Sequence, residues 1–219
     1  MAVFLRKMYL RQKKNCMNTQ YFDERAEKWD AHEASVKRAE KIYRKIAELI
    51  AINDTDTVLD FGCGTGLLGF NFIDKVKTVT FADTSKGMLE QISKKAGRFY
   101  IQNYKTLNVN ENAISEKFNI VVSLMAMHHI ADTGKTVRAL AENLLPGGYI
   151  CFSDLDVEDG SFHYPDVAPH NGIERNVITG NLSAGGISII YNETVHVDSK
   201  TVRGSVKEFP VFLIIGIKR

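Results

Sequence analysis

The chain has 219 residues, of which 44% are hydrophobic and 25% are charged, and its formal net charge is +2 at pH 7. This length supports one sizeable hydrophobic core and leaves little room for a second. The charge is too small to predict a nucleic-acid partner, and no apolar run is long enough to predict a membrane span.

The first sixteen residues are rich in Lys and Arg and contain no acid. We therefore expect a basic extension at 1–16 and a single domain at 17–219, divided into a helical segment (17–55), a core (56–154) and a C-terminal part (155–219). The cysteines Cys16, Cys63 and Cys151 fall in the extension, a glycine-rich turn and a predicted strand. That distribution is typical of a reducing compartment, so we expect a cytoplasmic protein without disulfides.

The segment from Phe22 to Ile50 has the composition of helices, with Ile42 and Ile46 at helical spacing toward a core. A short apolar strand, Val58–Phe61, then leads directly into a turn that contains Gly62, Gly64 and Gly66. Glycines at these places let the backbone turn sharply and approach a ligand closely.

The spacing of the glycines indicates which kind of nucleotide cofactor the turn would bind. A dinucleotide-binding loop has its third glycine one position later, where this chain has Leu67. A nicotinamide-dependent dehydrogenase is therefore the weaker alternative.

A second predicted strand, Thr78–Ala82, ends at Asp83, about 20 residues after the glycine turn. An acid at this place can accept hydrogen bonds from both hydroxyls of a ribose. The alternative is a helix cap at a strand-to-helix turn. Met88 in the following helix would flank a base or belong to the core.

Further strands are predicted at Phe99–Gln102, Phe118–Leu124 and, after a Pro-Gly-Gly turn, in the segment Leu144–Asp154. A helix is expected to start within 170–175. The segments Gly186–Val197 and Glu208–Ile217 predict two long strands joined by a turn that contains Gly204.

Asp60 to Gly66 fits the pattern E/D-x-G-x-G-x-G, and 83–89 is close to D-x-S-x-x-M-L. With 118–130 and 144–154 in matching order, the chain resembles class I S-adenosylmethionine-dependent methyltransferases, and within them an uncharacterised small-molecule sub-group of type 11/12. The resemblance implies a doubly wound, Rossmann-like α/β fold. Its seven-stranded sheet would be mostly parallel with an antiparallel C-terminal hairpin, and helices would cover both faces.

The resemblance also implies S-adenosylmethionine as cofactor and S-adenosylhomocysteine as product. The cofactor residues would be Asp60, Gly62, Gly64 and Gly66 at the methionine part, Asp83 and Thr84 at the ribose, Met88, Asn103 and Tyr104 at the adenine, and Ser123 and Met125 near the transferred methyl group. Phe22 and Trp29 would belong to a lid over the cofactor.

His128, His129 and His163 are the candidate catalytic residues, because an imidazole can remove a proton from a phenol, enol or amine. Alternatively, the tandem histidines only bond backbone carbonyls. Acids between Asp154 and Asp159 could join the histidines at a divalent metal, but the spacing matches no strong metal signature and a solvated loop is the simpler interpretation. We therefore expect no metal.

The predicted function is methyl transfer to an oxygen, nitrogen or carbon atom of a small-molecule acceptor. The alternative is a catalytically silent S-adenosylmethionine-binding protein with a regulatory or assembly role. We expect a monomer or homodimer with neither a nucleic-acid partner nor a membrane span.

Overall fold

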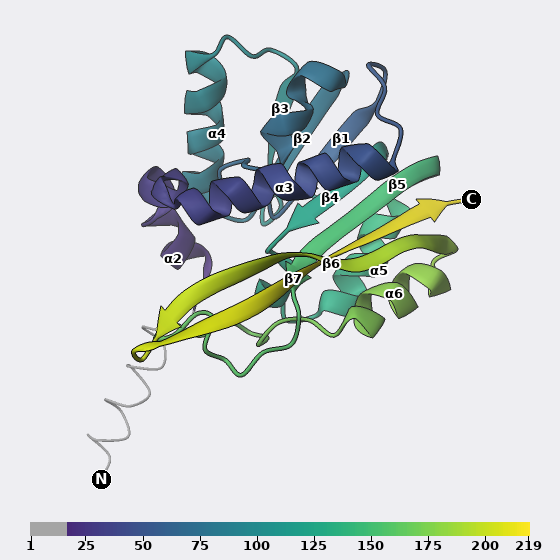
Figure 1. Cartoon of the computed structure of the whole chain (residues 1–219). Helices are drawn as coiled ribbons and strands as arrows, with labels where there is room; N and C mark the ends of the chain where they lie inside the picture. Colours follow the sequence, from purple (N-terminus) through teal and green to yellow (C-terminus); the bar gives the residue numbers. More distant parts are fainter. Residues whose placement is uncertain (1–16) are drawn as a thin grey trace.

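Seven strands form one sheet in the order β3-β2-β1-β4-β5-β7-β6 in the computed structural model, which describes residues 17–219 (Figure 1). The strands are β1 (Thr57–Phe61), β2 (Thr78–Asp83), β3 (Tyr104–Asn108), β4 (Phe118–Leu124), β5 (Leu144–Leu155), β6 (Ile187–Val202) and β7 (Ser205–Lys218). Strand β7 pairs antiparallel with both β5 and β6, and the other neighbours pair parallel. The predicted fold class is confirmed.

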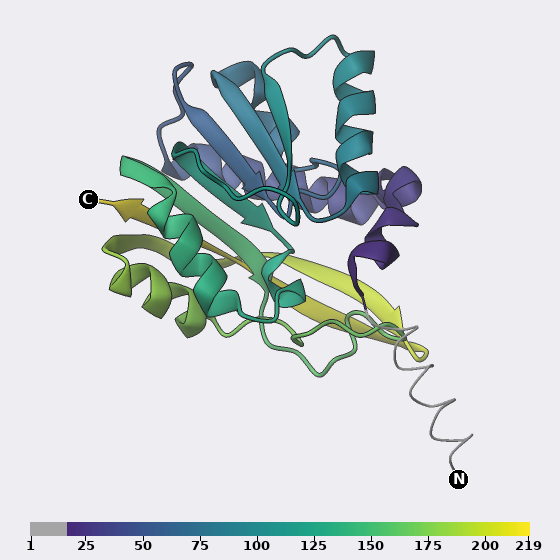
Figure 2. The ribbon, with the colours of Figure 1, turned by 180° about the vertical axis from the view of Figure 1, so that it is seen from behind.

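Helices cover both faces of the sheet, as Figures 1 and 2 show from opposite sides. The helical elements are α2 (Thr19–Asp23), η1 (Ala26–Ala31), α3 (Glu33–Leu49), η2 (Gly69–Lys75), α4 (Lys86–Arg98), η3 (Met127–His129), α5 (Thr133–Glu142) and α6 (Arg175–Ala184). One core lies between the sheet and α3, η2 and α4, and a second core lies between the sheet and α5 and α6. The central strands β1, β2 and β4 are therefore buried on both faces, which explains their continuous apolar runs.

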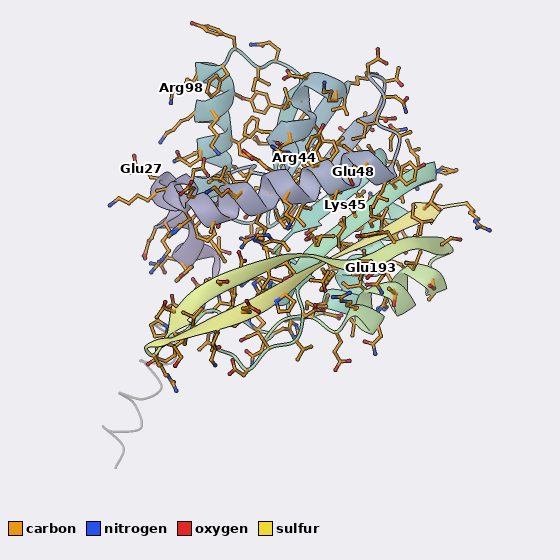
Figure 3. All side chains as sticks on the ribbon, in the orientation of Figure 1. Glu27, Arg44, Lys45, Glu48, Arg98 and Glu193 are labelled. Atoms are coloured by element: carbon orange, nitrogen blue, oxygen red, sulfur yellow. The ribbon has the colours of Figure 1, made fainter. Side chains whose placement is uncertain are left out.

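Helix α3 shows how the sequence pattern places an element on the sheet. Ile42 and Ile46 are fully buried against the sheet, whereas Arg44 and Glu48 are exposed on the outer side of the helix (Figure 3). Apolar residues at a spacing of four define the buried stripe, so amphipathicity fixes the rotation of the helix about its axis.

The predicted strand at Phe99–Gln102 is wrong. Helix α4 continues to Arg98, and Tyr100 has a φ of 56°, which ends the helix. Strand β3 begins only at Tyr104, lies at the edge of the sheet and is exposed at its centre, so it has no apolar run to reveal it. The carboxyl end of this strand is therefore Asn108.

The two predicted C-terminal strands are present, and both are longer than expected, since they meet at a turn of Arg203 and Gly204. Helix α6 begins at Arg175, at the far end of the range predicted for its start. No helix within 17–219 is both long and apolar enough to cross a membrane. The prediction of a basic extension at 1–16 lies outside the described residues.

Candidate functional site

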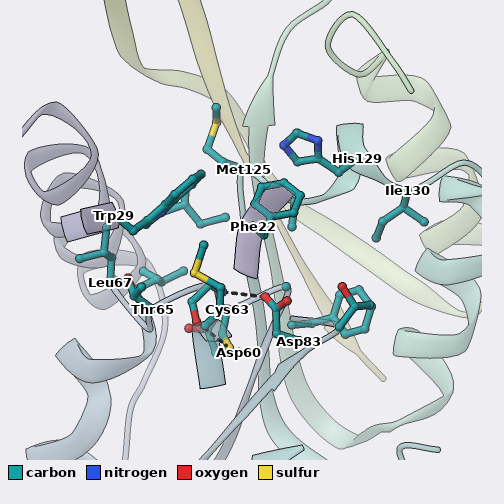
Figure 4. Close-up of a pocket in the computed structure, with 18 of the residues that line it drawn as sticks. Phe22, Trp29, Asp60, Cys63, Thr65, Leu67, Asp83, Met125, His129 and Ile130 are labelled. Carbon is teal, nitrogen blue, oxygen red and sulfur yellow. Dashed lines mark hydrogen bonds between the residues drawn. The ribbon is translucent and has the colours of Figure 1, made fainter. Parts of the chain in front are cut away.

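The carboxyl ends of β1, β2 and β4 border a cavity of about 540 Å³ (Figure 4). Asp60 and Phe61 line it from β1, Asp83 from β2 and Leu124 from β4. Open α/β sheets bind ligands at this edge, and the volume lies in the range of small-molecule sites.

The glycine-rich turn forms one wall of the cavity. Gly62 has a φ of 65°, and a Cβ there would lie 2.4 Å from Cβ of Ala126, so no side chain fits. Gly64 has a φ of 51°, and the nearest atom to a Cβ there is Nε1 of Trp29 at 4.0 Å. The backbone at Gly64 is therefore open to a ligand in the cavity.

Asp83 fastens this turn to the end of β2. One carboxylate oxygen accepts a hydrogen bond from N–H of Gly64 at 2.8 Å, and the other accepts from N–H of Ser85 at 2.9 Å. Burial raises the pKa of Asp83, while these backbone hydrogen bonds act to lower it. A carboxylate can accept about four hydrogen bonds, so Asp83 has accepting capacity left for a ligand.

Asp60 lies at the base of the cavity and is almost fully buried. Its carboxylate accepts a hydrogen bond from N–H of Gly69 at 2.9 Å. Burial raises the pKa of Asp60 to about 7, although this hydrogen bond favours the charged form.

Side chains that precede the sheet form a roof over the cavity. Phe22 and Trp29 line it and pack edge to face with ring centroids 5.8 Å apart. Asp23 fastens the roof, because its carboxylate accepts hydrogen bonds from the hydroxyl of Ser85 at 2.6 Å and from N–H of Gly87 at 2.9 Å. The roof is thus tied to the start of α4, next to Asp83.

The far end of the cavity combines apolar walls with an imidazole. Met125, which has a φ of 55°, and Ile130 line it together with His129. The rings of His129 and Phe22 pack edge to face at 5.1 Å (Figure 4). This end offers a flat ligand apolar contacts and one hydrogen-bonding group.

His129 belongs to a cluster of three imidazoles. Nε2 of His128 lies 2.9 Å from Nε2 of His163, and Nδ1 of His128 bonds the carboxylate of the fully buried Asp154. His128 and His129 follow β4 and Asp154 is in β5, which pairs with β4, so parallel pairing brings them together. Burial lowers the pKa of His163 to about 3 and that of His129 to about 2, so both rings are neutral at pH 7.

The comparisons with known proteins agree with this geometry. Residues 59–150 match the family model of a methyltransferase domain. An uncharacterised methyltransferase of Schizosaccharomyces pombe is 30% identical over 151 residues, which cover 60% of this chain and 53% of that protein. The YcgJ protein of Bacillus subtilis superposes with a TM-score of 0.66 at 19% identity, over 82% of this chain and 98% of that one. Residues 59–150 of this chain are thus similar to a methyltransferase domain, and its fold is that of the superposed solved structure.

Other relatives are named by their reactions. A ubiquinone biosynthesis O-methyltransferase of Alkalilimnicola ehrlichii is 32% identical over 108 residues, which cover 48% of this chain and 44% of that protein. The N-methyltransferase NodS of Bradyrhizobium japonicum, solved with S-adenosylhomocysteine, has a TM-score of 0.61 at 14% identity, over 82% and 85% of the two chains. The chain spans about half the length of the curated relatives it matches.

The cavity fits S-adenosylmethionine, the cofactor that the similarity to methyltransferases implies. The open backbone at Gly64 leaves room beside the glycine turn, and the carboxylate of Asp83 borders the same space. Met88 and Val109 supply apolar walls on this side, as a purine ring requires. Of the predicted cofactor residues, the structure places Asp60, Gly62, Gly64, Asp83, Thr84, Met88 and Met125 around the cavity.

The structure does not place Asn103 and Tyr104, the predicted adenine contacts, at the cavity. Both residues lie at the amino end of β3, whereas the cavity lies at the carboxyl ends of the strands. Nδ2 of Asn103 donates hydrogen bonds to the carbonyls of Ile73 at 2.8 Å and Val76 at 3.2 Å. The error follows from the misplaced third strand. Val109, directly after the true β3, lines the cavity instead.

Two further predicted cofactor residues, Gly66 and Ser123, do not line the cavity. A Cβ at Gly66 would lie 2.8 Å from the ring of Phe70, so this glycine serves packing within the turn rather than the cavity. Ser123 is buried inside the sheet beyond the cavity wall, because strand alternation turns it away while Leu124 faces the ligand side.

Of the three predicted catalytic histidines, only His129 lines the cavity, and His128 and His163 lie behind it. Sequence reasoning missed Arg38 of α3, a cavity residue that forms a buried ion pair with Asp198 of β6. No sequence signal connects these two residues, which are 160 positions apart.

Proposed function

We propose that this protein is a methyltransferase that transfers a methyl group from S-adenosylmethionine to a small-molecule acceptor. The observation that carries the proposal is the continuity of the cavity. It extends from Gly64 and Asp83, where the cofactor would lie, to Met125, His129 and Ile130, where a second ligand would lie. A protein that only binds the cofactor has no need for that second space.

Bound S-adenosylmethionine supplies an electrophilic methyl group on a positively charged sulfur. The chain's own task is to hold an acceptor atom in line with that methyl group and to keep water away. Asp83 would hold the ribose by accepting hydrogen bonds from it in addition to those from the backbone. Phe22 and Trp29 would exclude water from above.

The acceptor would lie between Met125, Phe22 and His129. A neutral imidazole can accept a hydrogen bond from an acceptor hydroxyl and so aim its oxygen. Because burial lowers the pKa of His129 so far, the ring is a weak base and its first task is orientation rather than proton removal.

Oxygen acceptors are the first class to test, because the named relatives include O-methyltransferases of ubiquinone biosynthesis and of malonyl-[acyl-carrier protein]. The apolar far end of the cavity favours phenols and quinols within this class. A cytoplasmic location and a monomeric or dimeric state remain predictions.

Calorimetric titration with S-adenosylmethionine, S-adenosylhomocysteine and NADH tests the cofactor. We expect micromolar binding of the two sulfur compounds and none of NADH. Formation of S-adenosylhomocysteine in the presence of phenols, quinols, carboxylic acids and amines then tests the reaction. Tight cofactor binding without turnover of any acceptor class would favour the regulatory alternative over the enzyme.

A further inference from the structure

The three histidines beside the cavity have the composition and spacing of a metal site. His128, His129 and His163 each offer one ring nitrogen, and these nitrogens all lie within 4.8 Å of one another. Around a tetrahedral Zn²⁺ with bonds of about 2.0–2.1 Å, any two ligand nitrogens are about 3.4 Å apart. The 2.9 Å pair of His128 and His163 is close to that spacing, and the third nitrogen, on His129, lies within 4.8 Å of the other two, so His129 would have to move closer to bind the same ion.

Asp154 gives this cluster a feature that metal sites share. Its carboxylate bonds Nδ1 of His128, and the same carboxylate accepts hydrogen bonds from N–H of Met127 at 2.8 Å and of Leu155 at 2.7 Å. The bond to Nδ1 fixes the His128 tautomer and leaves Nε2 with a free lone pair that points at His163. Histidine ligands of metals are held in this way by a carboxylate on the other ring nitrogen.

Hydrogen bonds among the three rings do not account for the whole cluster. A proton shared between His128 and His163 satisfies those two nitrogens, but Nδ1 of His129 is buried without a hydrogen-bond partner among residues 17–219. A buried polar atom left unpaired costs free energy. A cation held between the three rings would supply the missing partner.

From this geometry we propose that His128, His129 and His163 bind a divalent transition-metal ion, with Zn²⁺ the expected ion because imidazole nitrogens suit it and soft sulfur ligands are absent from the cluster. Three histidines leave one coordination position open, as in catalytic zinc sites. His129 lines the cavity, so the ion would lie at the acceptor end. A role of the ion in binding the methyl acceptor rests on the proposed function, whereas binding of the ion to the three histidines does not. The proposal departs from our sequence-based expectation of no metal.

Metal titration of the tag-free, full-length protein tests the site. After treatment with a chelator, the protein is titrated with Zn²⁺ by calorimetry and with Co²⁺ by visible absorption, which reports four-coordinate cobalt. We expect one ion per chain with micromolar or tighter affinity. His163→Gln should weaken binding at least tenfold, as the loss of a ligand requires.

The matched control is His170→Gln, the same substitution in the same loop at a histidine whose Nε2 bonds the carbonyl of Ile130 outside the cluster. It should change metal affinity less than twofold. His129→Gln is a second ligand variant should His163→Gln fail to fold, which circular dichroism checks. Absence of binding, or equal affinities of the ligand variants and the control, overturns the proposal.

Titration of S-adenosylhomocysteine into the same samples keeps the two proposals separate. Cofactor binding without metal binding overturns the metal site and leaves the proposed function intact. Metal binding with loss in the ligand variants supports the site even where no acceptor is turned over.

Discussion

Replacing Asp83 by Asn would test the cofactor assignment most directly. The substitution keeps the shape of the side chain and removes its charge and one of its two accepting oxygens. Hydrogen bonds from the ribose to a charged acceptor contribute about 1.5–3 kcal/mol, so the dissociation constant of S-adenosylhomocysteine should rise about 10- to 150-fold. Calorimetry at pH 7.5 measures this change without turnover.

The same substitution should also lower the stability of the apoprotein. Both carboxylate oxygens of Asp83 accept backbone hydrogen bonds, from Gly64 and Ser85, and the amide of Asn leaves one of these N–H groups unpaired. The expected loss in the free energy of unfolding is about 1–3 kcal/mol by urea denaturation. Asp74→Asn, at an exposed position outside the cavity, is the control and should change neither quantity. Wild-type affinity in folded Asp83→Asn protein would refute the ribose assignment.

Gly62→Ala should cost about 1–3 kcal/mol of stability in urea, because its new Cβ meets Ala126 at 2.4 Å; a stable variant would contradict the close approach. Since burial raises the pKa of Asp60 from 3.8 to about 7, the folded state holds this proton more tightly than the unfolded chain. Asp60 should therefore lower the free energy of unfolding as the pH rises from 3.8 to about 7. Asp60→Asn should make stability less dependent on pH in this range, and parallel pH profiles of the wild type and the variant would contradict this reasoning. Arg38→Met should cost about 3–5 kcal/mol in urea, because it leaves the buried Asp198 carboxylate without its arginine partner and, within residues 17–219, with only the contact to His196; an unchanged free energy of unfolding would contradict this.

The sequence predicted those parts of the fold whose signal is local. The glycine turn after β1 and the acid after β2 are set by backbone geometry within a few residues, so pattern and spacing located them. The position of strand β3 was not predicted, because β3 is an edge strand and Lys105 and Thr106 at its centre are exposed. The aromatic residues Phe99 and Tyr100, which are exposed, were instead interpreted as part of a strand. Because the third strand was predicted too early in the chain, the adenine contact was predicted at the amino end of β3 instead of its carboxyl end.

The candidate site was predictable where it depends on adjacent strands and not where it depends on tertiary packing. His129 was found because residues after a central parallel strand face the ligand edge. The bond between His128 and Asp154 and the ion pair between Arg38 and Asp198 join side chains from separate elements. Neither has a sequence pattern, because their geometry exists only after the sheet and α3 have assembled.

The attachment of the roof has a consequence for ligand exchange. Asp23 bonds Ser85, two residues beyond Asp83, and Tyr21 donates to Asp166 at 2.9 Å on the loop that carries His163. The segment therefore bridges the two ends of the cavity through polar contacts, which water can replace at low cost. Amide hydrogen exchange at residues 19–31 should slow when S-adenosylhomocysteine is bound, so exchange in this segment would measure whether the cavity is occupied. Opening of the same segment would limit the rate at which S-adenosylhomocysteine dissociates.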